Sequence, residues 1–207
     1  MTASSTQNSA RHAALALLAA LCCQTTPAAH AAQPPGYTLA RQGDSHDFDF
    51  LAGAWSTVQR RLKARGVGSQ DWDAFPANLC MTHYLDGIAN VDELHMPTLN
   101  RRGLTLRTFD TQKRQWSIYW VASPLGRLDP IPVVGGFQGG RGEFYGEDKD
   151  GDKPVKVRFI WESLDHDHAR WQQAFSYDDR SWETNWTAEF TRADPAAVCD
   201  QGRPKRS

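Results

Sequence analysis

Four segments in the second half of the chain alternate apolar and polar residues at a spacing of two, and this pattern constrains the fold more than any other feature of the sequence. The segments are residues 114–121, 155–162, 168–176 and 181–192. Successive side chains of a β-strand point to opposite faces, so this alternation predicts strands with one buried and one solvated face. The residues expected on the buried faces are Trp116, Ile118, Trp120, Val155, Val157, Phe159, Trp161, Ala169, Trp171, Gln173, Phe175, Trp182, Thr184, Trp186, Ala188 and Phe190.

Weaker strand patterns fill most of the remaining chain, and the longest of them is expected to bend or break near Gly87. They lie at residues 54–63, 78–94, 103–110 and 141–148. Turn-forming residues separate the segments, which favours strands joined by short hairpins. An aromatic-rich face shared by so many strands is best buried when the sheet closes on itself. The sequence therefore predicts an all-β fold, an antiparallel up-and-down barrel of about eight to ten strands, with a short N-terminal helical turn that Ser45 caps and Gly53 ends.

The N-terminal region has the layout of a secretory signal peptide. Arg11 precedes an apolar run at residues 13–23, which is too short to span a bilayer, and Ala29-His30-Ala31 is a small-x-small cleavage site. The predicted organisation is a signal peptide at 1–31, a flexible leader at 32–44, a barrel domain at 45–194 and a C-terminal tail at 195–207. We therefore expect a periplasmic or secreted protein with no transmembrane span after cleavage.

Lipid modification at Cys22 or Cys23 is the alternative to simple cleavage, but Leu21 stands where a small residue should precede the modified cysteine. Two further cysteines, Cys80 and Cys199, follow the signal peptide. They would pair in an oxidising compartment, and two free thiols are the alternative. The chain has 23 basic and 24 acidic residues, and its basic residues form no run except a short one at the C-terminus, so nucleic acid is not expected as a partner.

The motif "FDFLAGAW" at 48–55, followed by strand patterns that end in "NWTAEFTR" at 185–192, resembles the lipocalin-like (calycin) barrels. More closely, it resembles a bacterial exported family of uncharacterised lipocalin-like proteins that open with Phe-Asp-Phe-x-x-Gly-x-Trp, and the resemblance covers roughly residues 47–192. It implies that Gly53 and Trp55 open the first strand and that Arg192, on the last strand, packs over Trp55 to close one end of the barrel. It also implies a cavity for a small ligand, without naming that ligand.

The buried aromatic rows are the leading candidate for a binding pocket. The predicted ligand-binding residues are Trp116, Trp120, Trp161, Trp171, Gln173 and Trp186. An unpaired buried amide costs about 1–3 kcal/mol, so Gln173 needs a neighbouring side chain, a water or a ligand as its partner. A barrel of this size either fills with its own side chains or holds one small ligand, so a packed core without a cavity is the alternative. Phe48, Phe50 and Leu51 are expected to plug the bottom, and no cofactor is predicted.

His83 and Glu93 form a second candidate, because they share one parity within the segment 78–94 and a buried pair of this kind could perform acid–base catalysis. A structural or exposed pair is the alternative, since Tyr84 and Ile88 give the opposite face an equal claim to burial. An enzyme of isomerase or hydrolase type would need such a group facing the cavity. A haem or nitric-oxide carrier of the nitrobindin type would need an inward histidine, and the four clear strands supply none.

Other motifs have simpler interpretations. His166 and His168, with Asp165 and Asp167, lie in a predicted hairpin turn and lack further ligands nearby in sequence, so no metal site is predicted. The segment "DKDGD" at 148–152 departs from a calcium loop and is interpreted as a hairpin turn. The glycine-rich stretch 133–146 lacks the lysine of a phosphate loop. Residues 123–141 are instead expected to form a flap over one end of the barrel, with Arg141 at its mouth.

These observations predict an exported lipocalin-like barrel that binds a small apolar or amphipathic ligand. The alternative is an enzyme that acts on a small hydrophobic substrate in the same cavity. A purely structural barrel would contain no cavity at all.

Overall fold

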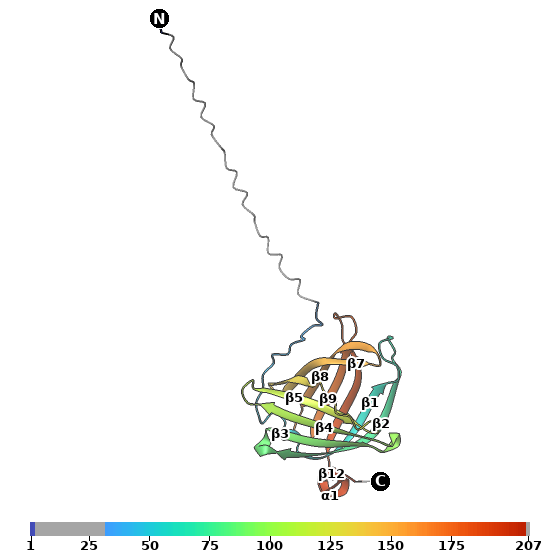
Figure 1. Ribbon diagram of the computed structural model, residues 1–207. Coiled ribbons are helices and arrows are strands. Elements are labelled where there is room, and N and C mark those ends of the chain that lie inside the picture. Colours follow the sequence, from blue (N-terminus) through green and yellow to red (C-terminus); the bar gives the residue numbers. More distant parts are fainter. Residues whose placement is uncertain (3–31, 206–207) are drawn as a thin grey trace. The chain divides into compact units, whose positions relative to one another are not determined.

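The computed structural model describes residues 1–2 and 32–205, and within these residues ten strands form the body of the protein (Figure 1). The strands are β1 (Gly53–Leu62), β2 (Trp72–Tyr84), β3 (Ala89–Met96), β4 (Arg101–Asp110), β5 (Gln115–Ala122), β6 (Val133–Gln138), β7 (Arg141–Asp150), β8 (Lys153–Ser163), β9 (His168–Ser176) and β10 (Glu183–Arg192). The smaller elements are η1 (Asp49–Leu51), η2 (Leu85–Gly87), η3 (Pro97–Leu99), α1 (Pro195–Val198), β11 (Cys199–Asp200) and β12 (Arg203–Pro204). No helix in this part of the chain is long and apolar enough to cross a membrane.

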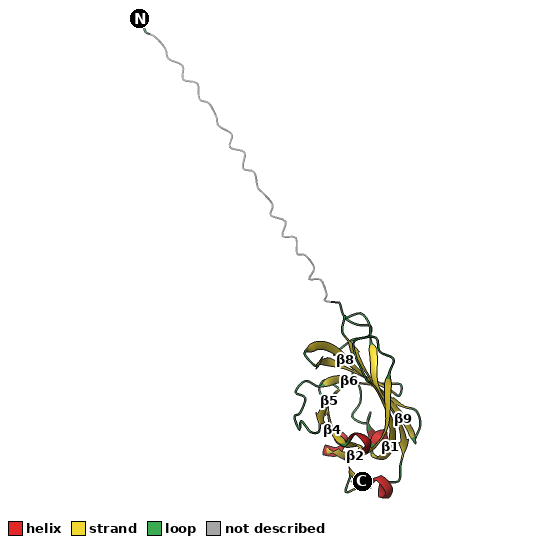
Figure 2. Cartoon of the chain, turned by 90° about the vertical axis from the view of Figure 1, so that its right-hand side faces the viewer, coloured by secondary structure: helices red, strands yellow, loops and turns green. Residues whose placement is uncertain are grey.

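The strands form a closed antiparallel barrel in which each strand pairs with the next along the chain, and β10 returns to pair with β1. The predicted all-β, up-and-down barrel is therefore confirmed. Figure 2 shows the strands wrapped around a common axis. The long segment predicted near 78–94 is divided by η2 into β2 and β3, and β2 begins earlier than expected, at Trp72. Pro76 is tolerated in this added part because it precedes the stretch of β2 that pairs with β3.

The strand register places the predicted apolar rows of β5, β8 and β9 inside the barrel, where Trp116, Trp161 and Phe175 are almost fully buried. The row predicted on β10 is interrupted by a bulge at Asn185, between Thr184 and Trp186. An extra residue in one strand reverses which parity faces inward. Trp186, Ala188 and Phe190 therefore belong to the inner face as predicted.

The prediction that Trp182 and Thr184 continue the inner row was wrong, because both residues precede the bulge. The indole N–H of Trp182 donates to the Pro35 carbonyl at 2.8 Å, and the Arg158 guanidinium lies 4.9 Å from its ring on the outer face of the barrel.

The segment that carries η1 plugs one end of the barrel. This is the end at which β1 begins and β10 finishes, and it is called the lower end. Phe48 and Leu51 are fully buried, and the Phe48 ring contacts the rings of Trp116 at 5.1 Å and Phe137 at 5.2 Å. Phe50 is partly buried against the same cluster. The predicted helical turn is shorter than expected, since η1 begins at Asp49 after Phe48 and receives no side-chain cap from Ser45.

The same end is closed by Arg192, which lies opposite Trp55 in the β1–β10 register. The Arg192 guanidinium carbon is 4.1 Å from the centre of the Trp55 ring. Its three nitrogens donate to backbone carbonyls, Nη1 to Ala52 at 2.9 Å, Nη2 to Phe50 at 2.8 Å and Nε to His166 at 2.9 Å. Gly53 begins β1 with a φ of +98°, a conformation that few residues other than glycine adopt. One side chain thus ties the plug to the first and last strands.

The segment 32–44, predicted as a flexible leader, has no helix or strand but packs against the barrel. Tyr37 contacts Tyr145 edge to face at 5.6 Å, and Arg41 forms an ion pair with Glu143 at 2.7 Å. The predicted signal peptide and its possible lipidation site fall within residues 3–31, which lie outside the described residues.

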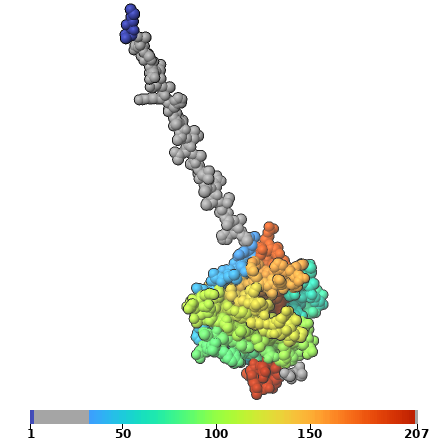
Figure 3. Space-filling model, in the orientation of Figure 1, coloured from blue at the N-terminus to red at the C-terminus, as the bar shows by residue number. Residues whose placement is uncertain are grey.

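A disulfide between Cys80 and Cys199 joins β2 to the C-terminal segment, with a Cα–Cα distance of 6.2 Å. This segment, formed by α1, β11 and β12, lies against the outer side of β1, β2 and β3. Figure 3 shows it in red, standing out from the green wall of the barrel. The region predicted as a tail therefore packs on the outside of the barrel and covers a small part of its wall.

The flap predicted at 123–141 is divided between a loop and a strand. Residues 123–132 form a loop, but Val133–Gln138 is β6, a strand that the sequence analysis missed. The prediction for Arg141 was wrong, because it lies at the plugged end of the barrel, where β7 begins. It forms ion pairs there with Glu143 at 3.0 Å and Glu162 at 2.6 Å.

Candidate functional site

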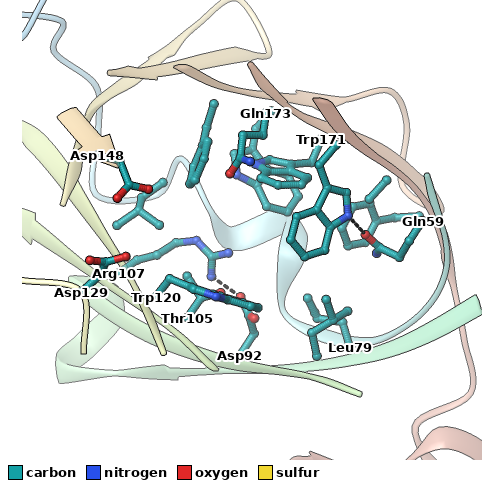
Figure 4. Close-up of a pocket in the computed structure, with 17 residues that line it drawn as sticks. Gln59, Leu79, Asp92, Thr105, Arg107, Trp120, Asp129, Asp148, Trp171 and Gln173 are labelled. Atoms are coloured by element: carbon teal, nitrogen blue, oxygen red, sulfur yellow. Dashed lines mark hydrogen bonds and ion pairs between the residues drawn. The ribbon is translucent and has the colours of Figure 1, made fainter. Parts of the chain in front are cut away.

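The interior of the barrel above the plug contains a cavity of about 140 Å³ (Figure 4). Its aromatic lining residues are Trp120, Phe159, Trp161, Trp171, Trp186 and Phe190. Its polar lining residues are Gln59, Asp92, Thr105, Arg107, Asp129, Asp148 and Gln173. The wall is thus mostly aromatic with a small number of polar groups, a composition typical of small-molecule sites.

Three indoles and a phenyl ring form a continuous aromatic wall centred on Trp171. The Trp171 ring lies 5.1 Å from Phe159, 5.7 Å from Trp186 and 6.3 Å from Trp161, measured between ring centres. These rings come from β8, β9 and β10, and they meet because the inward positions of adjacent antiparallel strands stand opposite each other. Edge-on and tilted packing of this kind holds the rings in fixed orientations.

Of the predicted ligand-binding residues, Trp120, Trp161, Trp171, Gln173 and Trp186 line the cavity, and Trp116 does not. Trp116 is fully buried against Phe48, and its indole N–H donates to the Asp44 carbonyl at 2.8 Å. It lies too close to the plugged end to reach the cavity, so its contacts belong to the plug.

Neighbouring side chains form hydrogen bonds with the two inward glutamines of the wall, Gln173 and Gln59. The Gln173 side-chain amide donates to the side-chain oxygen Oδ1 of Asn185 at 2.8 Å. On β1, which pairs with β10, Gln59 accepts a hydrogen bond from the Trp186 indole N–H at 2.8 Å and donates to the Thr57 hydroxyl at 2.8 Å. A neighbour therefore satisfies Gln173, and these bonds fix the two wall residues.

An ion pair between Arg107 on β4 and Asp92 on β3 forms the most polar part of the cavity lining, and the sequence analysis did not identify it. Both side chains are at least 98% buried, and Arg107 Nη1 lies 2.5 Å from Asp92 Oδ2 and 3.1 Å from the Asn90 side-chain oxygen. The guanidinium carbon lies 4.9 Å from the Phe48 ring centre and 5.5 Å from that of Trp161. Figure 4 shows the guanidinium reaching from one side of the cavity toward Asp92.

Two polar atoms of this pair have no hydrogen-bond partner among the residues that the structure describes, namely Arg107 Nε and Asp92 Oδ1. Buried polar atoms without partners are rare in folded proteins, because each costs the full desolvation of the group. The ion pair in the cavity lining therefore holds one donor and one acceptor without partners.

The cavity reaches the surface beside the 123–132 loop, since Asp129 and Asp148 line it and are also exposed to solvent. Figure 4 shows both carboxylates on the side of the pocket opposite Gln59. Partial burial raises the pKa of the Asp148 carboxyl, the Lys149 backbone N–H opposes this rise, and the charge of Asp129 adds to it. The mouth of the cavity is thus acidic.

The loop beside the mouth also exposes Leu125, Leu128 and Ile131. On β1, the Arg61 guanidinium carbon lies 5.4 Å from the centre of the Trp186 ring. Burial, together with the positive charges of Arg101 and Arg65, lowers the pKa of Arg61.

His83 and Glu93 do not form the predicted pair, because η2 lies between their strands and reverses the parity. His83 pairs with Asn90 in an inward register, whereas Glu93 pairs with Cys80 and forms an ion pair with Arg102 on the outer face. His83 faces the plug, with Nε2 at 3.7 Å from Asp49 Oδ1. Within the described chain, none of the residues that line the cavity is a histidine.

The histidines of the turn at 165–168 are exposed and pair with their neighbouring aspartates, His166 with Asp167 at 2.7 Å and His168 with Asp165 at 2.9 Å. No group of three or more metal-ligating side chains occurs in residues 1–2 and 32–205. The segment 148–152 forms the predicted hairpin, in which Asp150 pairs with Lys153 and Gly151 has a φ of +64°.

The sequence matches no protein-family model and no curated protein.

Proposed function

We propose that this chain is an exported lipocalin-like barrel that binds a small apolar or amphipathic molecule in its cavity. The observation that carries the proposal is the cavity itself, which is about 140 Å³ in volume and bounded by six aromatic side chains. A barrel whose inward residues merely filled the core would leave no such space. An apolar cavity of about 150 Å³ in another protein binds benzene, so the space is sufficient for a small aromatic molecule.

The closure of the lower end supports the same assignment. Gly53, Trp55 and Arg192 meet as the resemblance to calycin barrels implies, and the plug leaves access to the cavity from the opposite end. The disulfide between Cys80 and Cys199 fits an oxidising compartment and therefore supports export.

The test is native mass spectrometry of the full chain purified from its own source, followed by tryptophan fluorescence titration with the molecule that co-purifies. A bound small molecule should be released on unfolding. The variant Trp171→Ala should retain the barrel, as judged by far-ultraviolet circular dichroism, and should bind at least about tenfold more weakly, because the central ring of the wall is lost.

The matched control is Trp72→Ala, since Trp72 lies on the outer face beside Arg60 and does not line the cavity. It should bind as tightly as the unaltered protein. Equal weakening in both variants would show that the effect comes from general destabilisation, and absence of any bound molecule together with no response to small aromatic probes would remove the proposal.

A further inference from the structure

The Arg107–Asp92 pair specifies more about the ligand than the aromatic wall does. Arg107 and Asp92 both line the cavity, and Arg107 Nε and Asp92 Oδ1 are buried and have no hydrogen-bond partner in the described part of the chain. The pair therefore leaves one donor and one acceptor unpartnered next to the cavity. A molecule that offers both an acceptor and a donor would remove the desolvation cost of both atoms.

The charge of the pair argues against an ionic group in contact with it. Arg107 and Asp92 already neutralise each other at 2.5 Å, so a carboxylate or ammonium group placed against the pair would lack a free counter-charge there. The remaining charged residues of the lining, Asp129 and Asp148, are acidic and lie at the mouth, where they disfavour an entering anion. The group that meets the pair should consequently be polar and uncharged.

We propose that the cavity selects a neutral, benzene-sized aromatic molecule that carries a hydroxyl group, and this inference rests on the proposed function. A single hydroxyl both accepts and donates, so it can accept from Arg107 Nε and donate to Asp92 Oδ1. The ring then packs against the wall centred on Trp171. The volume of about 140 Å³ limits the apolar part to about one six-membered ring.

The experiment measures the affinity of the full-length, disulfide-bonded protein for four probes, namely phenol, fluorobenzene, benzene and benzoate, by tryptophan fluorescence and calorimetry. Fluorobenzene has nearly the shape of phenol but cannot donate a hydrogen bond. Hydrogen bonds to charged groups justify an expected preference of at least about tenfold for phenol over fluorobenzene and benzene. Benzoate should bind more weakly than phenol.

A double variant, Arg107→Met with Asp92→Leu, tests whether the pair causes the preference. Either single variant would leave a buried, unpaired charge, which strongly destabilises a fold, whereas replacing both partners by apolar residues is often neutral for stability. The double variant should bind benzene within about threefold of the unaltered protein and should lose the preference for phenol. The four-probe comparison on the unaltered protein decides the matter even where the double variant does not fold.

Each result separates this inference from the proposed function. Equal affinity for phenol, fluorobenzene and benzene would overturn the inference, because it would mean that the phenol hydroxyl gains nothing from the Arg107–Asp92 pair. The proposed function as a binding protein would be unaffected by that result. Tightest binding of benzoate would overturn it in favour of anion recognition. If none of the four probes binds, the inference fails, and the proposed function then depends on the co-purified molecule.

Discussion

Replacing Arg192 should open the lower end of the barrel, and the structure gives the expected cost. The variant Arg192→Met removes a guanidinium that lies 4.1 Å from the Trp55 ring and donates to three backbone carbonyls. A cation–π contact contributes about 0.5–2 kcal/mol, depending on its desolvation. A hydrogen bond to a charged group contributes about 1.5–3 kcal/mol when buried.

The expected total is smaller than the sum of these contributions, because water can reach the site and the methionine retains part of the packing. The Arg192 side chain is 24% exposed. We expect the free energy of unfolding to fall by about 3 kcal/mol, which is a large share of the 5–15 kcal/mol typical of a domain. Arg192→Lys should recover less than half of the loss, because an ammonium group cannot reach three carbonyls from one planar fork.

Urea unfolding followed by circular dichroism measures this change at constant disulfide state. The matched control is Arg170→Met on the neighbouring strand, where the guanidinium pairs with Glu189 at 2.9 Å on the surface. That change should cost no more than about 1 kcal/mol. If Arg192→Met costs no more than the control, the claim that this side chain ties the plug to the first and last strands is refuted.

Three further predictions concern the wall and the mouth. Replacing Cys80 and Cys199 by serine should lower the free energy of unfolding by about 2–5 kcal/mol, because the disulfide closes a sequence separation of 119 residues. Gly103→Ala should lower it by about 1–3 kcal/mol and displace Trp120, since the added methyl group would lie 1.8 Å from Trp120 Cη2. Partial burial raises the pKa of the Asp148 carboxyl above its ordinary value of 3.8, so its ionisation is easier in the unfolded chain. The free energy of unfolding should therefore fall as the pH rises above 3.8. The variant Asp148→Asn should lack this contribution to the pH dependence.

Urea titrations check the first and third of these predictions, the third by comparison of pH 4 with pH 7. A crystal structure or the fluorescence emission maximum checks the second. Unchanged stability of the serine variant, an undisturbed Trp120, or an identical pH dependence in Asp148→Asn would each contradict the corresponding argument.

The barrel could be predicted from the sequence because its clearest strands each have one buried face and one solvated face. In β5, β8 and β9 the apolar residues at every second position face the core, and the polar residues between them face outward. β6 was missed because its glycines, Gly135 and Gly136, suggested a mobile loop. In the structure these positions lie against neighbouring backbone, at Glu143 and Gln42, where a larger residue would not fit.

The position of the bulge on β10 was not predictable from alternation, since Asn185 looks like an ordinary polar residue in an outer row. The bulge turns Asn185 inward, where it is fully buried and accepts the hydrogen bond from Gln173. The predicted inward amide of Gln173, which had no assigned hydrogen-bond partner, indicated that some polar neighbour had to face inward. It did not identify which one, because the partner comes from a different strand.

The polar pair was hidden for a different physical reason, which also explains why it matters. On β3 the inward residues include Asn90 and Asp92, whereas His95 belongs to the outward row and is nevertheless buried by the C-terminal segment. Burial on both faces removes the contrast on which the alternation rule depends. A buried ion pair is also weak evidence for stability, because apolar residues of similar volume often stabilise a core equally well. Stability alone therefore does not account for Arg107 and Asp92 beside an aromatic cavity, whereas the recognition of a polar ligand group that we propose would account for them.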